Sequence, residues 1–303
     1  MRWNRRTFLK AGGALGVSGL IPPTLLRAET PLLRRPIPSS GELLPMIGIG
    51  TQQYTSAGGP DQIAARREVF RVFEQSGGKV IDTAPSYRAA EQVVGDLVAE
   101  LQIRPALFLA TKLESLSEGG PQQLERSFQY LRTSMIDLVA VHNLLDIWPQ
   151  LATLRGAKAA GRIRYVGITT SFARQHADFE RTMRAETLDF IQVDYALDNR
   201  EAGNVILPLA ADRGMAVMIN LPFGRGRLFR AVSTVPLPPW AADFDCSSWA
   251  QFFLKYILAH PAVTCAIPGT SNPAHLRDNL AAATGRLPDA AMRRRMEQFI
   301  DGV

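Results

Sequence analysis

The sequence has little of what marks several common classes of protein. It contains two cysteines, Cys246 and Cys265, in 303 residues, and its four histidines form no close pair at the end of a predicted strand. Two cysteines make a weak case for a disulfide, and neither has the spacing of a metal ligand. No metal site is therefore predicted, and a metal-dependent hydrolase is disfavoured. Cys265 lies in an apolar run at 264–267, where we expect a free thiol in the core.

Charge of one sign is scarce outside the N-terminus. The net charge is +6, but five of the 34 lysines and arginines, and no acidic residue, lie in residues 1–28. The rest of the chain carries 29 basic against 28 acidic side chains. No basic surface is predicted, so nucleic-acid binding is not expected. Hydrophobic residues make up 46% of the chain, which is enough for a sizeable core and excludes disorder and collagen-like repetition.

The N-terminal segment resembles a twin-arginine export signal. Arg5 and Arg6 precede an uncharged, mildly apolar stretch at 11–26 that two prolines interrupt. These sixteen residues fall short of the roughly 20 apolar residues that span a membrane. We therefore predict a removable signal over residues 1–28, recognition by the twin-arginine export machinery, a periplasmic or otherwise exported protein, and no stable membrane span. A basic arm that opens an amphipathic helix is the alternative.

From residue 46 onward, short runs rich in Ile and Val alternate with longer segments of helical periodicity. This alternation is typical of βα units around a parallel sheet. Strands are predicted at 46–50, 79–84, 107–113, 136–143, 165–170, 190–196, 216–222 and 265–270. Eight strands close a (β/α)8 TIM barrel, and 33–38 with 42–44 predicts an N-terminal β-hairpin across the barrel floor. A doubly wound open sheet is less favoured, because no Gly-x-Gly-x-x-Gly follows a predicted strand.

A single barrel domain is thus expected over residues 29–303. Helices are predicted at 66–75, 90–101, 122–133, 148–160, 204–213, 249–259, 273–281 and 289–299. The step from the seventh to the eighth strand is the longest, about 45 residues, and a connection of this length predicts a flap over the barrel mouth.

Four ionisable residues are predicted to meet at one end of the barrel. Asp82, Lys112 and His142 are 30 residues apart, one βα unit per step, and each falls near the carboxyl end of a predicted strand. Tyr87 follows in the loop after Asp82. Each residue alone has an ordinary structural explanation, but barrel enzymes place their active sites on this face.

The chemistry of the four residues centres on the phenol of Tyr87. A buried Lys112 needs a charged partner, which Asp82 on the neighbouring strand provides. A free tyrosine has a pKa of about 10, and we predict that the nearby Lys112 lowers the pKa of Tyr87 enough for proton exchange. His142 would orient a carbonyl oxygen or share the proton. None of the four is an obvious nucleophile, so a separate hydride source is expected.

From about residue 33 to 300 the chain resembles the aldo-keto reductase family. The resemblance rests on motifs in a fixed order: PMIGIGT at 45–51, IDTA at 81–84 with Tyr87, Glu91 and Gly95, ATK at 110–112, IDL at 136–138 with His142, GRIRYVG at 161–167, and IPGT at 267–270 leading to Asn279. It implies that Tyr87 is the general acid, Lys112 and Asp82 its tuning pair, and His142 the substrate-orienting residue. It also implies hydride transfer between NAD(P)H and an aldehyde or ketone.

The chain departs from the family pattern on the cofactor side. Thr169-Thr170 replaces the usual Ser-Asn, Asn220 aligns with a stacking tyrosine, and Gly269 and His275 align with the cations around the 2′-phosphate. NADP is the family default, and NAD is possible because this charge clamp is thin. The resemblance implies cofactor contacts at Thr169, Thr170, Gln192, Asn220, Thr270, Arg277 and Asn279. A helix cap explains the polar run at 270–273 equally well.

Residues just past the predicted strand ends are candidates for contact with a small-molecule carbonyl substrate. These are Gln53, Tyr54 and Trp148. A second hypothesis for the whole protein is an exported redox sensor or assembly partner that holds its cofactor and turns over slowly. It is motivated by export to a compartment where free NADPH is not expected to be supplied.

Overall fold

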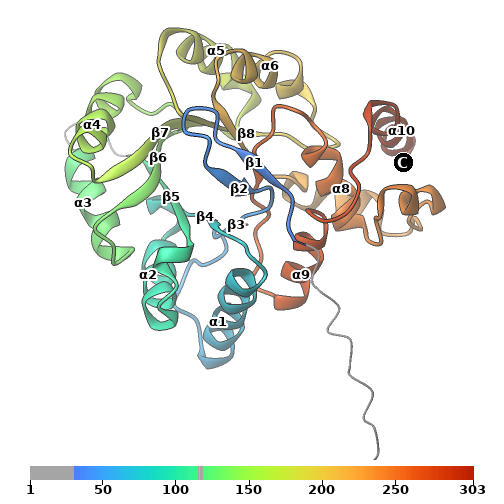
Figure 1. Cartoon of the computed structure of the whole chain (residues 1–303), viewed down its shortest axis with the longest axis horizontal. Coiled ribbons are helices and arrows are strands. Elements are labelled where there is room, and N and C mark those ends of the chain that lie inside the picture. Colours follow the sequence, from blue (N-terminus) through green and yellow to red (C-terminus); the bar gives the residue numbers. More distant parts are fainter. Residues whose placement is uncertain (1–30, 115, 117–118) are drawn as a thin grey trace, which may run out of the picture.

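The computed structural model describes residues 31–114, 116 and 119–303, so the export signal expected at 1–28 lies outside the described residues. Within that part of the chain, eight parallel strands form one curved sheet in the order β3 to β10 (Figure 1). Their bounds are β3 (Ile49–Gly50), β4 (Val80–Asp82), β5 (Phe108–Leu113), β6 (Ile136–His142), β7 (Ile163–Thr169), β8 (Phe190–Asp194), β9 (Ala216–Asn220) and β10 (Cys265–Ala266).

The first and last strands of the sheet meet. Parallel bridges pair Ile47 with Ala266 and Gly50 with Gly269. Gly50 is required at this seam, because a Cβ atom there would lie 2.9 Å from the carbonyl oxygen of Ile267. The predicted (β/α)8 barrel is confirmed, and each predicted strand overlaps an observed one, although β7 begins two residues earlier than predicted.

The predicted hairpin is also confirmed. β1 (Arg34–Pro36) pairs antiparallel with β2 (Leu43–Pro45), and Figure 1 shows this hairpin lying across the middle of the barrel. Ile37 and Leu44 are fully buried against side chains from the beginnings of the strands, such as Val80 and Phe108. The hairpin therefore closes the floor with apolar contacts, which leaves the carboxyl ends of the strands as the open face.

Helices surround the sheet (Figure 1). Their bounds are α1 (Pro60–Gln75), α2 (Ala90–Leu101), α3 (Gly120–Tyr130), α4 (Ile147–Ala159), α5 (His176–Ala185), α6 (Ile206–Asp212), α7 (Arg227–Ala231), α8 (Trp249–Leu258), α9 (Pro273–Ala281) and α10 (Ala290–Asp301). Helix α1 begins six residues earlier than predicted, with Pro60 and Asp61 in its first turn, where both residue types favour a helix start. Helices α5 and α7 were not predicted, since α5 is mostly polar and α7 has five residues.

The connection from β9 to β10 forms a flap only at its beginning. Residues 221–226 reach the open face, whereas the later part packs on the outside of the barrel, where Trp240 contacts Phe252 and Phe299. The predicted flap over the barrel mouth is therefore confined to residues 221–226, because the later part forms an aromatic cluster with α8 and α10.

The described part of the chain contains no helix with the length and apolar character needed to cross a membrane. Cys246 and Cys265 are buried free thiols. Among the same residues, no cluster of three histidine, cysteine or carboxylate side chains is placed to bind a metal ion.

Candidate active site

The four predicted catalytic residues lie together at the open face. Asp82 and His142 are the last residues of β4 and β6, and Lys112 lies near the end of β5 between them. The short 3₁₀ helix η1 (Pro85–Tyr87) follows β4 directly and carries Tyr87 back over the strand ends. The Tyr87 ring lies edge-on to His142 with centroids 6.3 Å apart, and Lys112 Nζ is 5.3 Å from the centre of the Tyr87 ring.

Lys112 and Asp82 form the predicted buried ion pair. Lys112 Nζ donates to both carboxylate oxygens of Asp82, at 2.9 and 2.7 Å, and to the carbonyl oxygen of Thr83 at 2.8 Å. The two residues are 2% and 3% exposed. Burial opposes the charged form of Lys112, but the Asp82 carboxylate and the Tyr87 phenol raise the pKa of Lys112 above its ordinary value. A fixed positive charge therefore lies next to the phenol.

The predicted lowering of the Tyr87 pKa is not what the structure shows. Burial of the phenol is the largest effect and raises the pKa of Tyr87 above its ordinary value. The charge of Lys112 opposes this effect, while the negative charges of Asp82 and Glu114 add to it. The hydroxyl of Tyr87 is therefore protonated at neutral pH, so the group is available as a proton donor.

Glu114 is a further residue of this cluster that was not predicted from the sequence. It lies two residues after Lys112, so both side chains leave β5 on the same face. Glu114 Oε2 contacts Nδ1 of His142. Burial acts to raise the pKa of Glu114, but hydrogen bonds from His142 and Ser86 bring it below its ordinary value, so the group is a carboxylate at neutral pH. Its spacing of two from Lys112 was the available sequence evidence.

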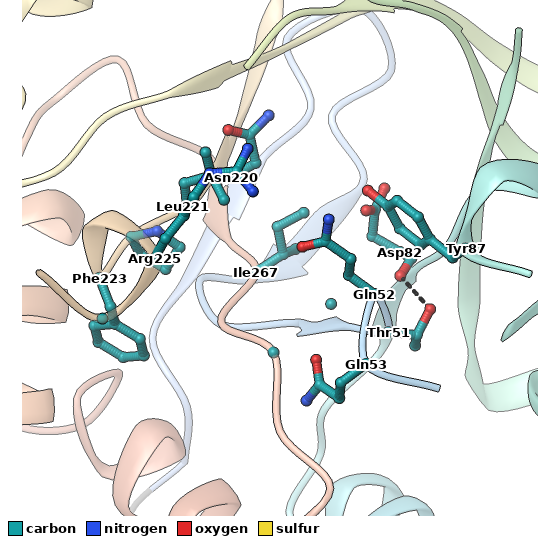
Figure 2. A pocket seen from close by; sticks show the side chains of 14 residues that line it. Thr51, Gln52, Gln53, Asp82, Tyr87, Asn220, Leu221, Phe223, Arg225 and Ile267 are labelled. Atoms are coloured by element: carbon teal, nitrogen blue, oxygen red, sulfur yellow. Dashed lines mark hydrogen bonds between the residues drawn. The ribbon is translucent and has the colours of Figure 1, made fainter. Parts of the chain in front are cut away.

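A cavity of about 210 Å³ opens beside Tyr87 and Asp82. Figure 2 shows these two side chains on one side of the cavity and the residues after β9 on the other. The lining residues labelled in that view include Thr51, Gln52, Gln53, Asn220, Leu221, Phe223, Arg225 and Ile267. Leu221 and Arg225 have positive φ angles of 48° and 55°, a strained conformation for residues with side chains, which bends this segment toward the cavity.

A second cavity of about 430 Å³ adjoins the first, and Phe223 and Gly269 line both. It lies at the beginnings of α8 and α9, where Trp249, His275 and Asp278 form part of its wall. Among the described residues, neither a lysine nor an arginine lines this second cavity. Together the two cavities form an elongated space that starts at the catalytic cluster.

The structure brings only some of the predicted cofactor residues to these cavities. Asn220 lines the first cavity and Asn279 the second. Asn220 Nδ2 donates to the carbonyl oxygen of Thr170 at 3.1 Å, and its buried Oδ1 has no hydrogen-bond partner in the part of the chain that the structure describes. A buried acceptor without a donor is costly, so Asn220 is suited to receive an N–H from a ligand.

Four other predicted cofactor residues form hydrogen bonds within the protein and do not line either cavity. Thr169 donates to Gln192 Oε1 at 2.9 Å, and Gln192 Nε2 donates to Asp82 at 2.9 Å, so both residues extend the ion pair rather than face the cavity. Thr170 donates to Gln175 at 2.6 Å. The Thr270 hydroxyl accepts from the backbone of Asn272 before α9, as a cap does.

Arg277 is the fifth predicted cofactor residue outside the two cavities. It lies on the exposed side of α9, with its Nη2 atom 3.9 Å from Oε1 of Glu68. Together with Arg34 it lines a surface groove. The polar run at 270–273 acts as a cap, with Asn272 accepting from Ala274 N at 2.8 Å.

Of the three predicted substrate contacts, Gln53 lines the first cavity. Tyr54 does not, and that prediction was wrong: its side chain is fully buried and its hydroxyl donates to the carbonyl oxygen of Thr270 at 2.9 Å. Trp148 is 54% exposed at the beginning of α4 and lines a separate groove with Leu144 and Gln175. The chain therefore folds Tyr54 into the core and turns Trp148 away from the catalytic cluster.

Comparisons with known proteins agree with this site. The profile of the Aldo/keto reductase family matches residues 46–299. An NADH-specific methylglyoxal reductase of Escherichia coli is 24% identical over 84% of this chain and 94% of its own length. Methylglyoxal reductase DkgA of Yersinia pestis is 30% identical over 53% of this chain and 58% of its own length.

Solved structures share the fold. A crystal structure of an aldo/keto reductase from Klebsiella pneumoniae, in complex with NADP and acetate, superposes with a TM-score of 0.71 at 22% identity over 86% of this chain and 93% of that one. Because the family profile covers most of the barrel and all four catalytic positions, the chain belongs to the aldo/keto reductase family, whose NAD(P)-dependent oxidoreductases act on carbonyl compounds.

Proposed function

We propose that this protein transfers a hydride between NAD(P)H and an aldehyde or ketone, with Tyr87 as the proton donor to the carbonyl oxygen. The observation that carries the proposal is the buried Lys112–Asp82 pair, which holds an ammonium 5.3 Å from the centre of a protonated phenol at the edge of a cavity. In reduction, a hydride adds to the carbonyl carbon and the Tyr87 proton goes to the oxygen. The product is an alcohol, and the phenolate left behind is stabilised by Lys112.

The residues of the two cavities fit a nicotinamide dinucleotide, which supplies the hydride when bound. Asn220 Oδ1 is a buried acceptor that still needs a donor, and an amide N–H of the nicotinamide carboxamide provides one. Asn279 would contact the far part of the cofactor, because it lines the second cavity. NADP is the family default, and NADH is also a candidate because the second cavity has no cation in its described wall.

The first substrate to test is a small 2-oxoaldehyde, because both curated relatives described above are named methylglyoxal reductases. The purified protein would be analysed by mass spectrometry for bound nucleotide and then assayed with fresh NADPH or NADH. Repeated turnover supports the proposed enzyme. A tightly held cofactor with a single slow turnover would favour the redox sensor or assembly partner instead.

We propose further that the protein is exported by the twin-arginine machinery to the periplasm or beyond. The support is the pair Arg5-Arg6 followed by the uncharged stretch at 11–26. Replacing both arginines by lysine keeps the charge but removes the pair that the machinery recognises. Cell fractionation would then find the altered protein in the cytoplasm, and unchanged export would contradict the proposal.

A further inference from the structure

The contact between Glu114 and His142 joins two side chains and lies outside the strand hydrogen bonds of β5 and β6. Both side chains lie at the open face, and they are 15% and 13% exposed. Glu114 follows the last residue of β5, and His142 is the last residue of the neighbouring strand β6. Glu114 therefore contacts the one predicted catalytic residue that the Lys112–Asp82 pair does not bind.

A carboxylate at Nδ1 determines where the imidazole carries its proton. The Glu114 carboxylate can only accept hydrogen bonds, so Nδ1 of His142 must be the donor in their contact. In the neutral ring the other nitrogen, Nε2, then has a lone pair and acts as an acceptor. A carbonyl oxygen is also an acceptor, so neutral His142 in this tautomer cannot donate to it from Nε2. Only the charged ring, with protons on both nitrogens, can do so.

The charges around His142 decide how readily that charged ring forms. Among the described residues, the titratable groups that face it are Glu114 and Lys112 from β5 and Tyr87 from η1, with Asp82 from β4 behind Lys112. On the other side, β7 contributes the uncharged Thr169 opposite His142 in the register. The charge of Lys112 is balanced by Asp82, which leaves Glu114 as the unbalanced charge in contact with the ring.

We propose that Glu114 is a positioning residue that fixes the proton of His142 on Nδ1 and stabilises the charged ring, so that His142 can hold a carbonyl oxygen from Nε2. The proposal rests on the proposed function of the site. During reduction the proton transferred to the oxygen still comes from Tyr87, and the ring keeps both of its protons. Alcohol oxidation is the reverse of this step, so the phenolate of Tyr87 accepts the hydroxyl proton while the ring holds the oxygen from Nε2.

The test compares two replacements of Glu114 by NMR of the full chain labelled with ¹⁵N at histidine, with His142→Gln used to assign the signals. Glu114→Gln keeps an oxygen acceptor but removes the charge, so the neutral ring should keep its Nδ1 proton. Glu114→Met removes the acceptor as well, so the Nδ1 tautomer should be lost. Glu100→Gln is the matched control, because it breaks a surface ion pair with Arg67 far from the site.

The kinetic test uses the pH dependence of kcat/KM for carbonyl reduction. In Glu114→Gln the loss of activity on the alkaline side should begin at a lower pH than in the unaltered protein. A purely structural role would lower kcat/KM at every pH without moving this alkaline limit. An unchanged Nδ1 tautomer in Glu114→Met, or equal alkaline limits in Glu114→Gln and the unaltered protein, would overturn the proposal. Absence of turnover in the unaltered protein would instead refute the proposed function, and the NMR comparison would still decide the role of Glu114.

Discussion

The two halves of the open face are built in different ways. On the half formed by β4, β5 and β6, the ionisable side chains are in contact with each other, as in Lys112–Asp82 and His142–Glu114. On the half formed by the ends of β9 and β10, a buried oxygen of Asn220 has no donor in the described chain, and the second cavity has no cation in its wall. The proton-transfer half is therefore complete in the protein alone, whereas the cofactor half requires its ligand to complete the hydrogen bonds.

This contrast predicts the largest effect at Tyr87. Tyr87→Phe keeps a ring against His142 but removes the proton donor, so kcat should fall by about 10²–10⁴-fold. Cofactor affinity, measured by fluorescence titration, should stay within about twofold, because the hydroxyl belongs to the proton-transfer half. Turnover equal to that of the unaltered enzyme on every carbonyl compound tested would show that Tyr87 is not the acid.

The second prediction concerns stability. Lys112→Met leaves the buried carboxylate of Asp82 without its partner and should lower the free energy of unfolding by about 3–5 kcal/mol, measured by urea denaturation. Adding Asp82→Asn to it removes the orphaned charge and should recover part of that stability, but not activity. If the double variant is no more stable than Lys112→Met, the pair is not the source of the loss.

The third prediction concerns Asn220 in the cofactor half. Its replacement should lower cofactor affinity, and the effect should be smaller than those at Tyr87 and Lys112. Asn220→Leu removes the unpaired acceptor, so cofactor binding should weaken by about fivefold to tenfold, equivalent to roughly 1 kcal/mol. Thr170→Val is the control, because the Thr170 hydroxyl donates to Gln175 and Thr170 lines neither of the two cavities. Unchanged affinity in Asn220→Leu would mean that the cofactor does not use this oxygen.

The smallest predicted effect is on cofactor choice. Gly269 lines both cavities, and a Cβ atom there would lie 2.6 Å from Oε1 of Gln53, the movable end of a side chain, and 3.2 Å from the backbone oxygen of Gly50. If Gln53 moves aside, Gly269→Lys should raise the ratio of NADPH to NADH affinity by about a few-fold, since it adds a cation to a wall whose described residues include none. Gly269→Met fills the same space without charge, and an equal change in both variants would exclude an electrostatic cause.

Much of the proton-transfer half could be predicted from the sequence. The 30-residue spacing of Asp82, Lys112 and His142 matches one βα unit, and parallel strands in register bring equivalent positions to one edge. The cost of burying a lysine then identified the partner of Lys112. These arguments use the repeat length of the βα unit and the need of a buried charge for a partner, and both can be read from the sequence.

The loops beyond the strand ends could not be predicted in this way. Tyr54 and Gln53 are adjacent in the sequence, yet a turn with Tyr54 N bonded to Thr51 O sends Tyr54 into the core and leaves Gln53 in the cavity. The role of Gln192 was hidden as well, because its amide binds Asp82 from a strand far away in the sequence. The direction of a loop side chain depends on such distant partners rather than on local pattern.

The apolar contacts that Ile37 and Leu44 make at the floor of the barrel determine how the reactants reach and leave the site. Because that end of the barrel is closed, the cofactor and the substrate must both enter and leave through the open face. The reactant that binds deeper must bind first and dissociate last. The closed floor therefore imposes an ordered sequence of binding and release.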